Sequence, residues 1–337
     1  MPQPPARNGP PGAFFDSDFS TIDSLLAVSL LYGLQGKGDC RVAIVNTSRP
    51  NLALVGFVDM VLRFYHGPAG NFSQIPAVGM ITSGTPGEIS PAFTVPFQKT
   101  KADGSPTYKN QVKSVIDTGD PCTLLRNYLE AQTDKGSFVV LAGPATNLAA
   151  ALAFRGLKEL IAAKVKLLTL AGGAFPEGPA ESHLKADIPA AKRLFAEWPT
   201  PIVVSGAEVG SALEFPGASI DKQFAEAVPD NPVADAYRAW KPMPYDTPSW
   251  AMAPALYAAR PKENYFKLSD PGRITVDDQG RTSFSASENG AHRYLIVDPA
   301  LKDKITAAYV ELASAKPEVR RFRGPVVQDD TPPPVKK

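Results

Sequence analysis

Short apolar runs alternate with helix-like segments along most of this chain. The runs expected to form strands are 13–16, 41–46, 78–81, 138–142, 165–171 and 202–205. The segments expected to form helices are 22–34, 51–65, 123–132, 146–155, 188–198 and 302–314. Because most of the strand runs are apolar throughout and most are followed by a helix, the pattern predicts an α/β fold. Its centre is a doubly wound, mostly parallel sheet with helices on both faces.

Other segments interrupt this alternation. Residues 82–114 are rich in Gly, Pro, Thr and Lys, which predicts a long loop or insertion. After residue 231 the chain becomes helical, and 274–276 and 281–284 then flank a turn-rich bridge, which predicts a hairpin. The expected organisation is a disordered lead at 1–12, one domain at 13–325 and a disordered tail at 326–337.

Composition excludes several classes of function. Of the 337 residues, 44% are hydrophobic and 20% are charged, and the net charge is +1, as in an ordinary globular protein. There is no basic stripe to predict nucleic-acid binding and no apolar run long enough to span a membrane. Cys40 and Cys122 are too few for a disulfide scaffold or a zinc site.

The first twelve residues bear on location. They lack the charged start and apolar core of a signal peptide, so the chain as written is expected to be cytoplasmic. A secreted or periplasmic protein whose leader had been trimmed would look the same.

Carboxylates gather where the first strand meets the first helix. Asp16 and Asp18 are two residues apart, so on a strand they would face one way, and Asp23 would lie near the start of the helix. In an α/β sheet this is the edge that presents ligand-binding groups. The alternative is that these acids serve only as turn and helix-cap residues.

Two later segments carry further candidates. Gly143-Pro144 follows the strand at 138–142, and Thr146 or Asn147 can cap the next helix. Glu181 and His183 follow the Gly172-Gly173-Ala174 turn. His183 could equally be an exposed loop histidine.

Taken in order, these motifs resemble the inosine-uridine-preferring nucleoside hydrolases. That family has Asp-x-Asp, then Asp-Asp, then Gly-Pro-Leu-Thr-Asn, a Gly-Gly-Ala strand end and a Glu-Phe-Asn tripeptide. Segments around 197–210, 244–250 and 271–276 look like a branch of the family found in bacteria. The resemblance covers roughly residues 13–300 and implies a nucleoside-hydrolase-like fold.

The resemblance also implies chemistry and roles. The family uses calcium to cleave the N-glycosidic bond of ribonucleosides. By correspondence, Asp16, Asp18 and the backbone carbonyl of Ala142 would hold the metal, with Asp18 as the catalytic base. Asp23, Asn147, Glu181 and His183 would bind the nucleoside or its ribose.

The departures from the family pattern concern the metal. The Asp-Asp pair is incomplete in Ile22-Asp23-Ser24, and the placement of a one-residue gap decides which member is missing. Ala251 stands where the family has a late Asp, and the nearest acid is Asp246, whose alternative role is in a turn. Losing carboxylates weakens calcium binding, so we expect calcium to be weakly bound or absent.

Two hypotheses follow. One is a nucleoside hydrolase that is weak or impaired, or whose site is rebuilt around Asp23, His183 or Asp246. The other is a non-catalytic relative that binds a nucleoside, a sugar or a protein partner. The sequence leaves the base preference and a homo-oligomer open.

Overall fold

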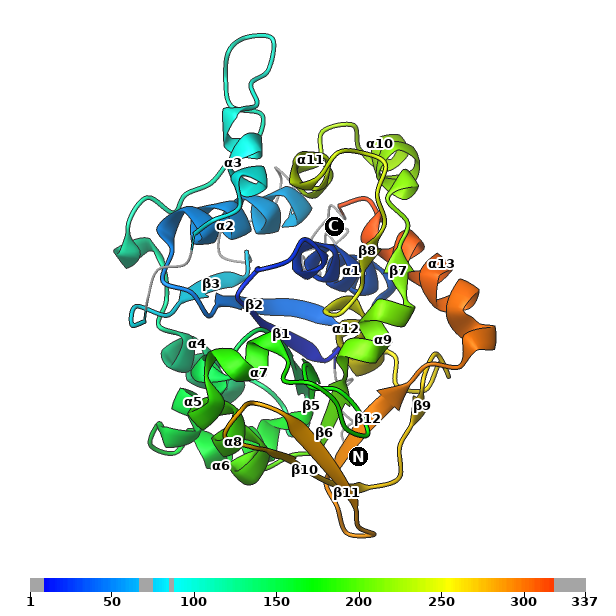
Figure 1. Cartoon of the computed structure of the whole chain (residues 1–337). Helices are drawn as coiled ribbons and strands as arrows, with labels where there is room; N and C mark the ends of the chain where they lie inside the picture. The colour runs from blue at the N-terminus through cyan, green and yellow to red at the C-terminus, as the bar shows by residue number, and fades with distance from the viewer. Residues whose placement is uncertain (1–8, 67–74, 85–87, 318–337) are drawn as a thin grey trace, which may run out of the picture.

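The computed structural model describes residues 9–66, 75–84 and 88–317, and within them one ten-stranded sheet forms the centre of the molecule (Figure 1). Seven strands run parallel in the order β3–β2–β1–β4–β5–β6–β12, and β9, β10 and β11 add antiparallel pairs. The strands are β1 (Gly12–Ser17), β2 (Arg41–Thr47), β3 (Ala77–Met80), β4 (Ser137–Ala142), β5 (Val165–Ala171), β6 (Ile202–Ser205), β9 (Lys267–Leu268), β10 (Gly272–Val276), β11 (Thr282–Ala286) and β12 (His292–Ile296).

Helices cover both faces of the sheet (Figure 1). One side carries α1 (Asp23–Lys37), α2 (Leu52–His66), α12 (Met252–Ala259) and α13 (Lys302–Ala313), and the other carries α4 (Pro121–Glu130), α5 (Thr146–Ala153), α6 (Leu157–Lys164) and α8 (Ile188–Glu197). Neighbouring residues of β1 serve opposite cores, since Phe14 packs into the α4–α8 side and Phe15 into the α1 side. The doubly wound α/β fold expected from the apolar runs is confirmed.

Shorter elements complete the described chain. They are α3 (Pro91–Gln98), α7 (Ser182–Ala186), α9 (Ala207–Ala212), α10 (Ala225–Ala227), α11 (Pro232–Trp240), the strand pair β7 (Glu214–Phe215) and β8 (Thr247–Pro248), 3₁₀ turns at Val115–Asp117 and Pro299–Leu301, and a π-helical turn at Ile220–Phe224. No helix among the residues that the structure describes is long and apolar enough to cross a membrane.

The interpretation of 82–114 as a loop is wrong for α3. Ser90 caps this helix by accepting from the Ala92 N–H, and Pro91 occupies its first turn. Phe93 is buried and stacks on Phe57 of α2 with ring centroids 5.1 Å apart. The helix therefore forms because tertiary packing covers its aromatic face, even though Pro96 lies inside it.

The expected disordered ends of the chain can be compared with the structure only in part. Gly12 belongs to β1 and not to a disordered lead. Residues 1–8 and the expected tail at 326–337 lie outside the described residues. The hairpin is confirmed as β10 and β11, and the last helix as α13.

The order of the strands places a site. From β1 the chain winds outward through β2 and β3, and β4, β5 and β6 extend the sheet in the opposite direction. The switch point lies between β1 and β4, and ligands of such sheets bind there, beyond the carboxyl ends of the strands. Asp18, Ala142 and Gly173 all lie at this edge, as the sequence predicted.

Helix α1 is enclosed between the sheet and α13. Gly33 of α1 allows the backbone of α13 to pack closely against it. A Cβ at Gly33 would lie 2.0 Å from the Leu312 backbone oxygen, whereas one at Gly56 of α2 would meet nothing closer than 3.7 Å. We expect Gly33→Ala to lower the free energy of unfolding by about 1–3 kcal/mol through overpacking. Gly56→Ala is the matched control, and should be neutral or stabilising by up to about 1 kcal/mol. Urea denaturation measures both, and equal effects would contradict the packing argument.

Candidate functional site at the carboxyl edge

Three chain segments meet closely where β1, β2 and β4 end. The Ser48 N–H donates to the Ser17 carbonyl at 3.0 Å and ties the end of β2 to the end of β1. A Cβ at Gly143, just after β4, would lie 2.6 Å from the Asp18 nitrogen and 3.0 Å from Ser48 Oγ. Only glycine fits at this position without displacing the backbone, so Gly143 lets the three segments converge.

Asp16 lies inside the sheet edge and not at its surface. Its side chain is fully buried, and Oδ2 accepts from Asn147 Nδ2 at 2.9 Å, while Oδ1 accepts no hydrogen bond from the residues that the structure describes, although the Asn46 side chain is close enough to oppose the rise in its pKa. Burial raises the pKa of Asp16 to about 7, and the hydrogen bond from Asn147 opposes the rise. Asn147 therefore binds Asp16 instead of pointing outward as a free ligand group.

Asp18 lies just beyond β1 and is held by three segments. Its Oδ2 accepts from Arg49 Nη2 at 3.0 Å, and its Oδ1 accepts from the Ser20 N–H at 3.0 Å and lies 3.6 Å from His183 Nε2. The side chain of Asp18 is only 5% exposed. Sequence reasoning missed Arg49, although its place two residues after a buried strand, at the same edge, was a usable signal.

The carbonyl of Ala142 has a partner inside the protein. The Ser17 hydroxyl donates to it at 2.8 Å and itself accepts from the Phe19 N–H at 2.9 Å, with Ser24 Oγ 3.1 Å away. Phe19 has φ of 50°, a conformation that costs energy for a non-glycine residue, so the turn after β1 is tightly constrained. One lone pair of the Ala142 oxygen is thus engaged by a hydroxyl from the neighbouring strand.

Asp23 serves as a structural clamp between two helices. It is fully buried at the first position of α1, its Oδ2 accepts from the Ala251 N–H at 2.6 Å, and its Oδ1 accepts from the Thr21 hydroxyl. Burial raises the pKa of Asp23, and the bond from Ala251 opposes this rise. The carboxylate therefore satisfies the start of α12, at the residue where the family has an acid.

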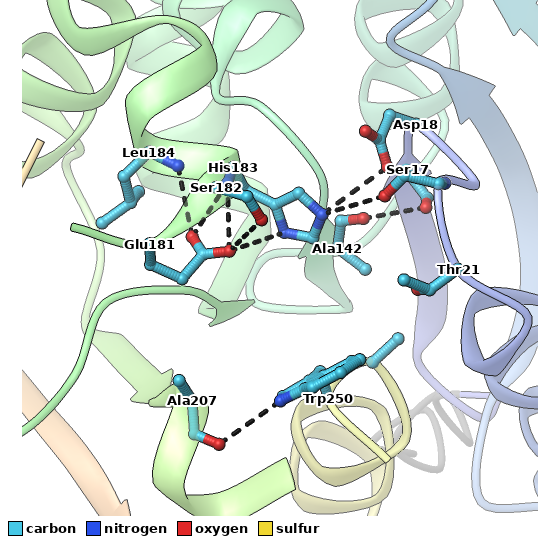
Figure 2. A network of polar contacts seen from close by, with 12 residues as sticks. Ser17, Asp18, Thr21, Ala142, Glu181, Ser182, His183, Leu184, Ala207 and Trp250 are labelled. Carbon is cyan, nitrogen blue, oxygen red and sulfur yellow. Dashed lines mark hydrogen bonds and ion pairs between the residues drawn. The ribbon is translucent and has the colours of Figure 1, made fainter. Parts of the chain in front are cut away.

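His183 lies between two carboxylates, and Figure 2 shows its ring flanked by Glu181 and Asp18. Glu181 caps α7, since its carboxylate accepts from the N–H groups of His183 and Leu184 at 3.0–3.2 Å. His183 Nε2 lies 3.4 Å from Ser20 Oγ, and Nδ1 lies 3.7 Å from Glu181 Oε1. The histidine is thus a partly buried residue of α7 beside Asp18 and not an exposed loop residue.

The remaining candidates lie on the other side of this region. Trp250 is opposite His183 in Figure 2, and its Nε1 donates to the Ala207 carbonyl at 3.3 Å. Asp246 is exposed, and its Oδ1 accepts from the Gly217 N–H at 2.8 Å. This bond joins Asp246 to a segment 29 residues away in sequence, so Asp246 caps neither its own turn nor the following helix.

The arrangement does not fit calcium, which takes six to eight oxygen ligands. Both oxygens of Asp23 accept internal hydrogen bonds, the Ala142 carbonyl accepts from Ser17, and Asp18 is paired with Arg49. Among the described residues, no group of three or more His, Cys, Asp or Glu could hold a metal ion. The acids are near one another but are directed to protein partners, so we derive no chemical step through a metal.

Comparison with known proteins supports the fold at low sequence identity. No protein-family model matches the sequence, and no curated protein sequence matches it. A plant nucleoside hydrolase superposes with a TM-score of 0.66 at 19% identity, covering 91% of this chain and 99% of its own. The purine-preferring ribonucleoside hydrolase from Gardnerella vaginalis gives 0.64 at 17%, covering 90% and 99%. The fold is therefore that of the nucleoside hydrolases.

A structure of another kind has the same fold. The type III effector protein XopQ, complexed with adenosine diphosphate ribose, superposes with a TM-score of 0.63 at 16% identity, covering 93% of this chain and 95% of that one. The fold is thus found in proteins described as enzymes and in one described as an effector.

The buried carboxyl of Asp16 makes stability depend on pH. The pKa of Asp16 is higher in the folded chain than the ordinary 3.8. The free energy that this carboxyl contributes to stability is therefore fully present below about pH 3.8 and is lost as the pH rises through about 7. In chelator-treated protein, Asp16→Asn should remove this loss of stability with rising pH. It should raise the free energy of unfolding at pH 8 by at most about 4 kcal/mol.

Urea denaturation between pH 4 and 8 measures the effect of Asp16→Asn. The exposed Asp103→Asn is the control and should leave the fall in place. If the free energy of unfolding depends on pH equally steeply in wild type and in Asp16→Asn, the pKa of Asp16 is not raised by burial.

Proposed function

We propose that this chain binds a ribonucleoside, or the ribose of a related ligand, at the carboxyl edge of the sheet without a metal ion. Hydrolysis of the N-glycosidic bond is slow or absent. The observation that carries the proposal is the clamp between Asp23 and Ala251, because it commits a central carboxylate to the protein.

Buried polar atoms at this edge support ligand binding. Among the described residues, Asp16 Oδ1, Ser48 Oγ, His183 Nδ1 and Ser205 Oγ have no hydrogen-bond partner. Asp16, Ser48 and Ser205 lie at the ends of β1, β2 and β6, and His183 lies in α7. A buried polar atom without a partner costs free energy, so such groups favour a polar ligand that bonds to them. Ribose, with its adjacent hydroxyls, offers both donors and acceptors.

The chemistry available without a metal is limited. Asp18 is the carboxylate placed to accept a proton from water, but its oxygens already accept from Arg49 and Ser20. A metal lowers the pKa of bound water and orients the sugar, and these residues supply neither effect. His183 can donate to a ligand hydroxyl, which supports binding more than bond cleavage.

A second candidate is a non-catalytic protein that binds an ADP-ribose-like ligand or acts through a protein partner. The observation favouring it is the fold shared with an effector complexed with adenosine diphosphate ribose. The two candidates differ in the size of the ligand, so a binding panel of ribose, inosine, uridine, adenosine and ADP-ribose separates them.

The first test concerns metal and turnover. Ribose release from inosine and uridine should be slow, and the rate should not differ between calcium-loaded and EGTA-treated protein. The physical reason is that no donor set at this edge is free to hold the ion. Turnover that rises strongly with calcium would overturn the proposal.

The second test concerns binding. His183→Ala removes a ring that lies beside Asp18, and should raise the Kd for the bound nucleoside about tenfold, the effect of one lost hydrogen bond. Ser182→Ala is the matched control on the same helix, since its exposed hydroxyl bonds only to Glu181 among the described contacts. Calorimetry measures both, and equal affinities for the two variants would remove His183 from the ligand site.

A further inference from the structure

We infer that Arg49 supplies, from within the chain, the positive charge that a bound cation would supply at Asp18, and so excludes divalent cations from this edge. The inference deepens the proposed function and rests on it in treating this edge as the ligand site. It concerns what keeps the site free of metal, a property that can be measured without any nucleoside.

The contact between the two side chains is direct and shielded. Arg49 Nη2 donates to Asp18 Oδ2 at 3.0 Å, with the arginine side chain 34% and the aspartate side chain 5% exposed. The other carboxylate oxygen accepts from the Ser20 N–H. A guanidinium stays charged at any pH that the protein survives, so it is a permanent counter-charge for a carboxylate shielded from water.

The backbone fixes Arg49 at this position. Its carbonyl accepts from the Asn51 N–H at 2.9 Å and from the Thr47 hydroxyl at 3.3 Å, and the preceding Ser48 is tied to Ser17. The turn that presents Arg49 is thus anchored to the same strand end that presents Asp18. The pair is therefore part of the convergence at Gly143 and does not come from a freely moving surface side chain.

The charge that Arg49 neutralises is one that would otherwise attract a cation. Asp16 and Asp18 interact as like charges, and Asp16 Oδ1 has no hydrogen-bond partner in the part of the chain that the structure describes. Without Arg49, Asp18 Oδ2 would lose its charged partner, and both carboxylates would present an oxygen to the same region. Hard oxygen donors of this kind are what calcium prefers.

The chain contains a matched pair for comparison. Arg63 Nε lies 2.7 Å from Asp59 Oδ2 on α2, with side chains 16% and 5% exposed. Asp59 also accepts from the Gln111 N–H at 2.6 Å. This pair is more shielded than the one at Asp18, lies within one helix, and has no second carboxylate among its described hydrogen-bond partners.

The experiment measures the melting temperature during a calcium titration of full-length protein stripped with EGTA. Wild type should not respond. Arg49→Met should melt lower in EGTA, and about 10 mM calcium should raise its melting temperature by about 2 °C or more. Arg49→Lys, which keeps the charge, should stay insensitive, and Arg63→Met should melt lower without any response to calcium.

The double variant Arg49→Met with Asp18→Asn identifies the ligand and should not respond to calcium. If Arg49→Met does not fold, Arg49→Gln replaces it, and the yield of refolding with and without calcium is then compared. A folded Arg49→Met or Arg49→Gln variant that ignores calcium, or a wild type that responds as strongly, would overturn the inference. Nucleoside binding by wild type is measured separately. A negative result in the calcium titration therefore contradicts the role of Arg49 but does not test the proposed function.

Discussion

The structure depends on the close convergence of three strand ends around buried carboxylates. Gly143 allows the segments after β1, β2 and β4 to touch, and this contact fixes the positions of Asp16 and Asp18. A carboxylate removed from water must be neutralised or hydrogen-bonded. This chain meets the requirement with its own groups, chiefly Asn147 for Asp16 and Arg49 for Asp18.

Asp23, the third acid, is likewise hydrogen-bonded to groups of the protein, and this restricts its availability to a ligand. Asp23 bonds to the start of α12 and to Thr21, so a residue at the end of the sheet joins two helices that are far apart in sequence. A carboxylate oxygen that accepts a short hydrogen bond from a backbone N–H has one lone pair engaged and is oriented by that bond. The nucleoside-hydrolase fold is thus combined with acids that bond mainly to groups of the protein.

The region around His183 has a different character. The ring nitrogens lie near Asp18, Ser20 and Glu181 at 3.4–3.7 Å, distances longer than most hydrogen bonds, and Trp250 lies opposite. These side chains come from three segments, which are the turn after β1, the start of α7 and the chain before α12. A ligand hydroxyl placed between them would find donors and acceptors, which is why binding is the function best supported here.

The sequence by itself determined the fold class and most strand positions, because buried parallel strands must be apolar throughout and their order in the chain sets the winding. It also placed Asp16, Asp18, Ala142 and Gly173 at one edge, since each follows or ends such a strand. It could not show α3, whose aromatic face is stabilised by packing on α2, nor the role of Arg49, whose partner is 31 residues away. Only the tertiary structure decided that Asp23 faces Ala251 and that Ser17 faces the Ala142 carbonyl, because hydrogen bonds between distant segments depend on how closely the backbones approach.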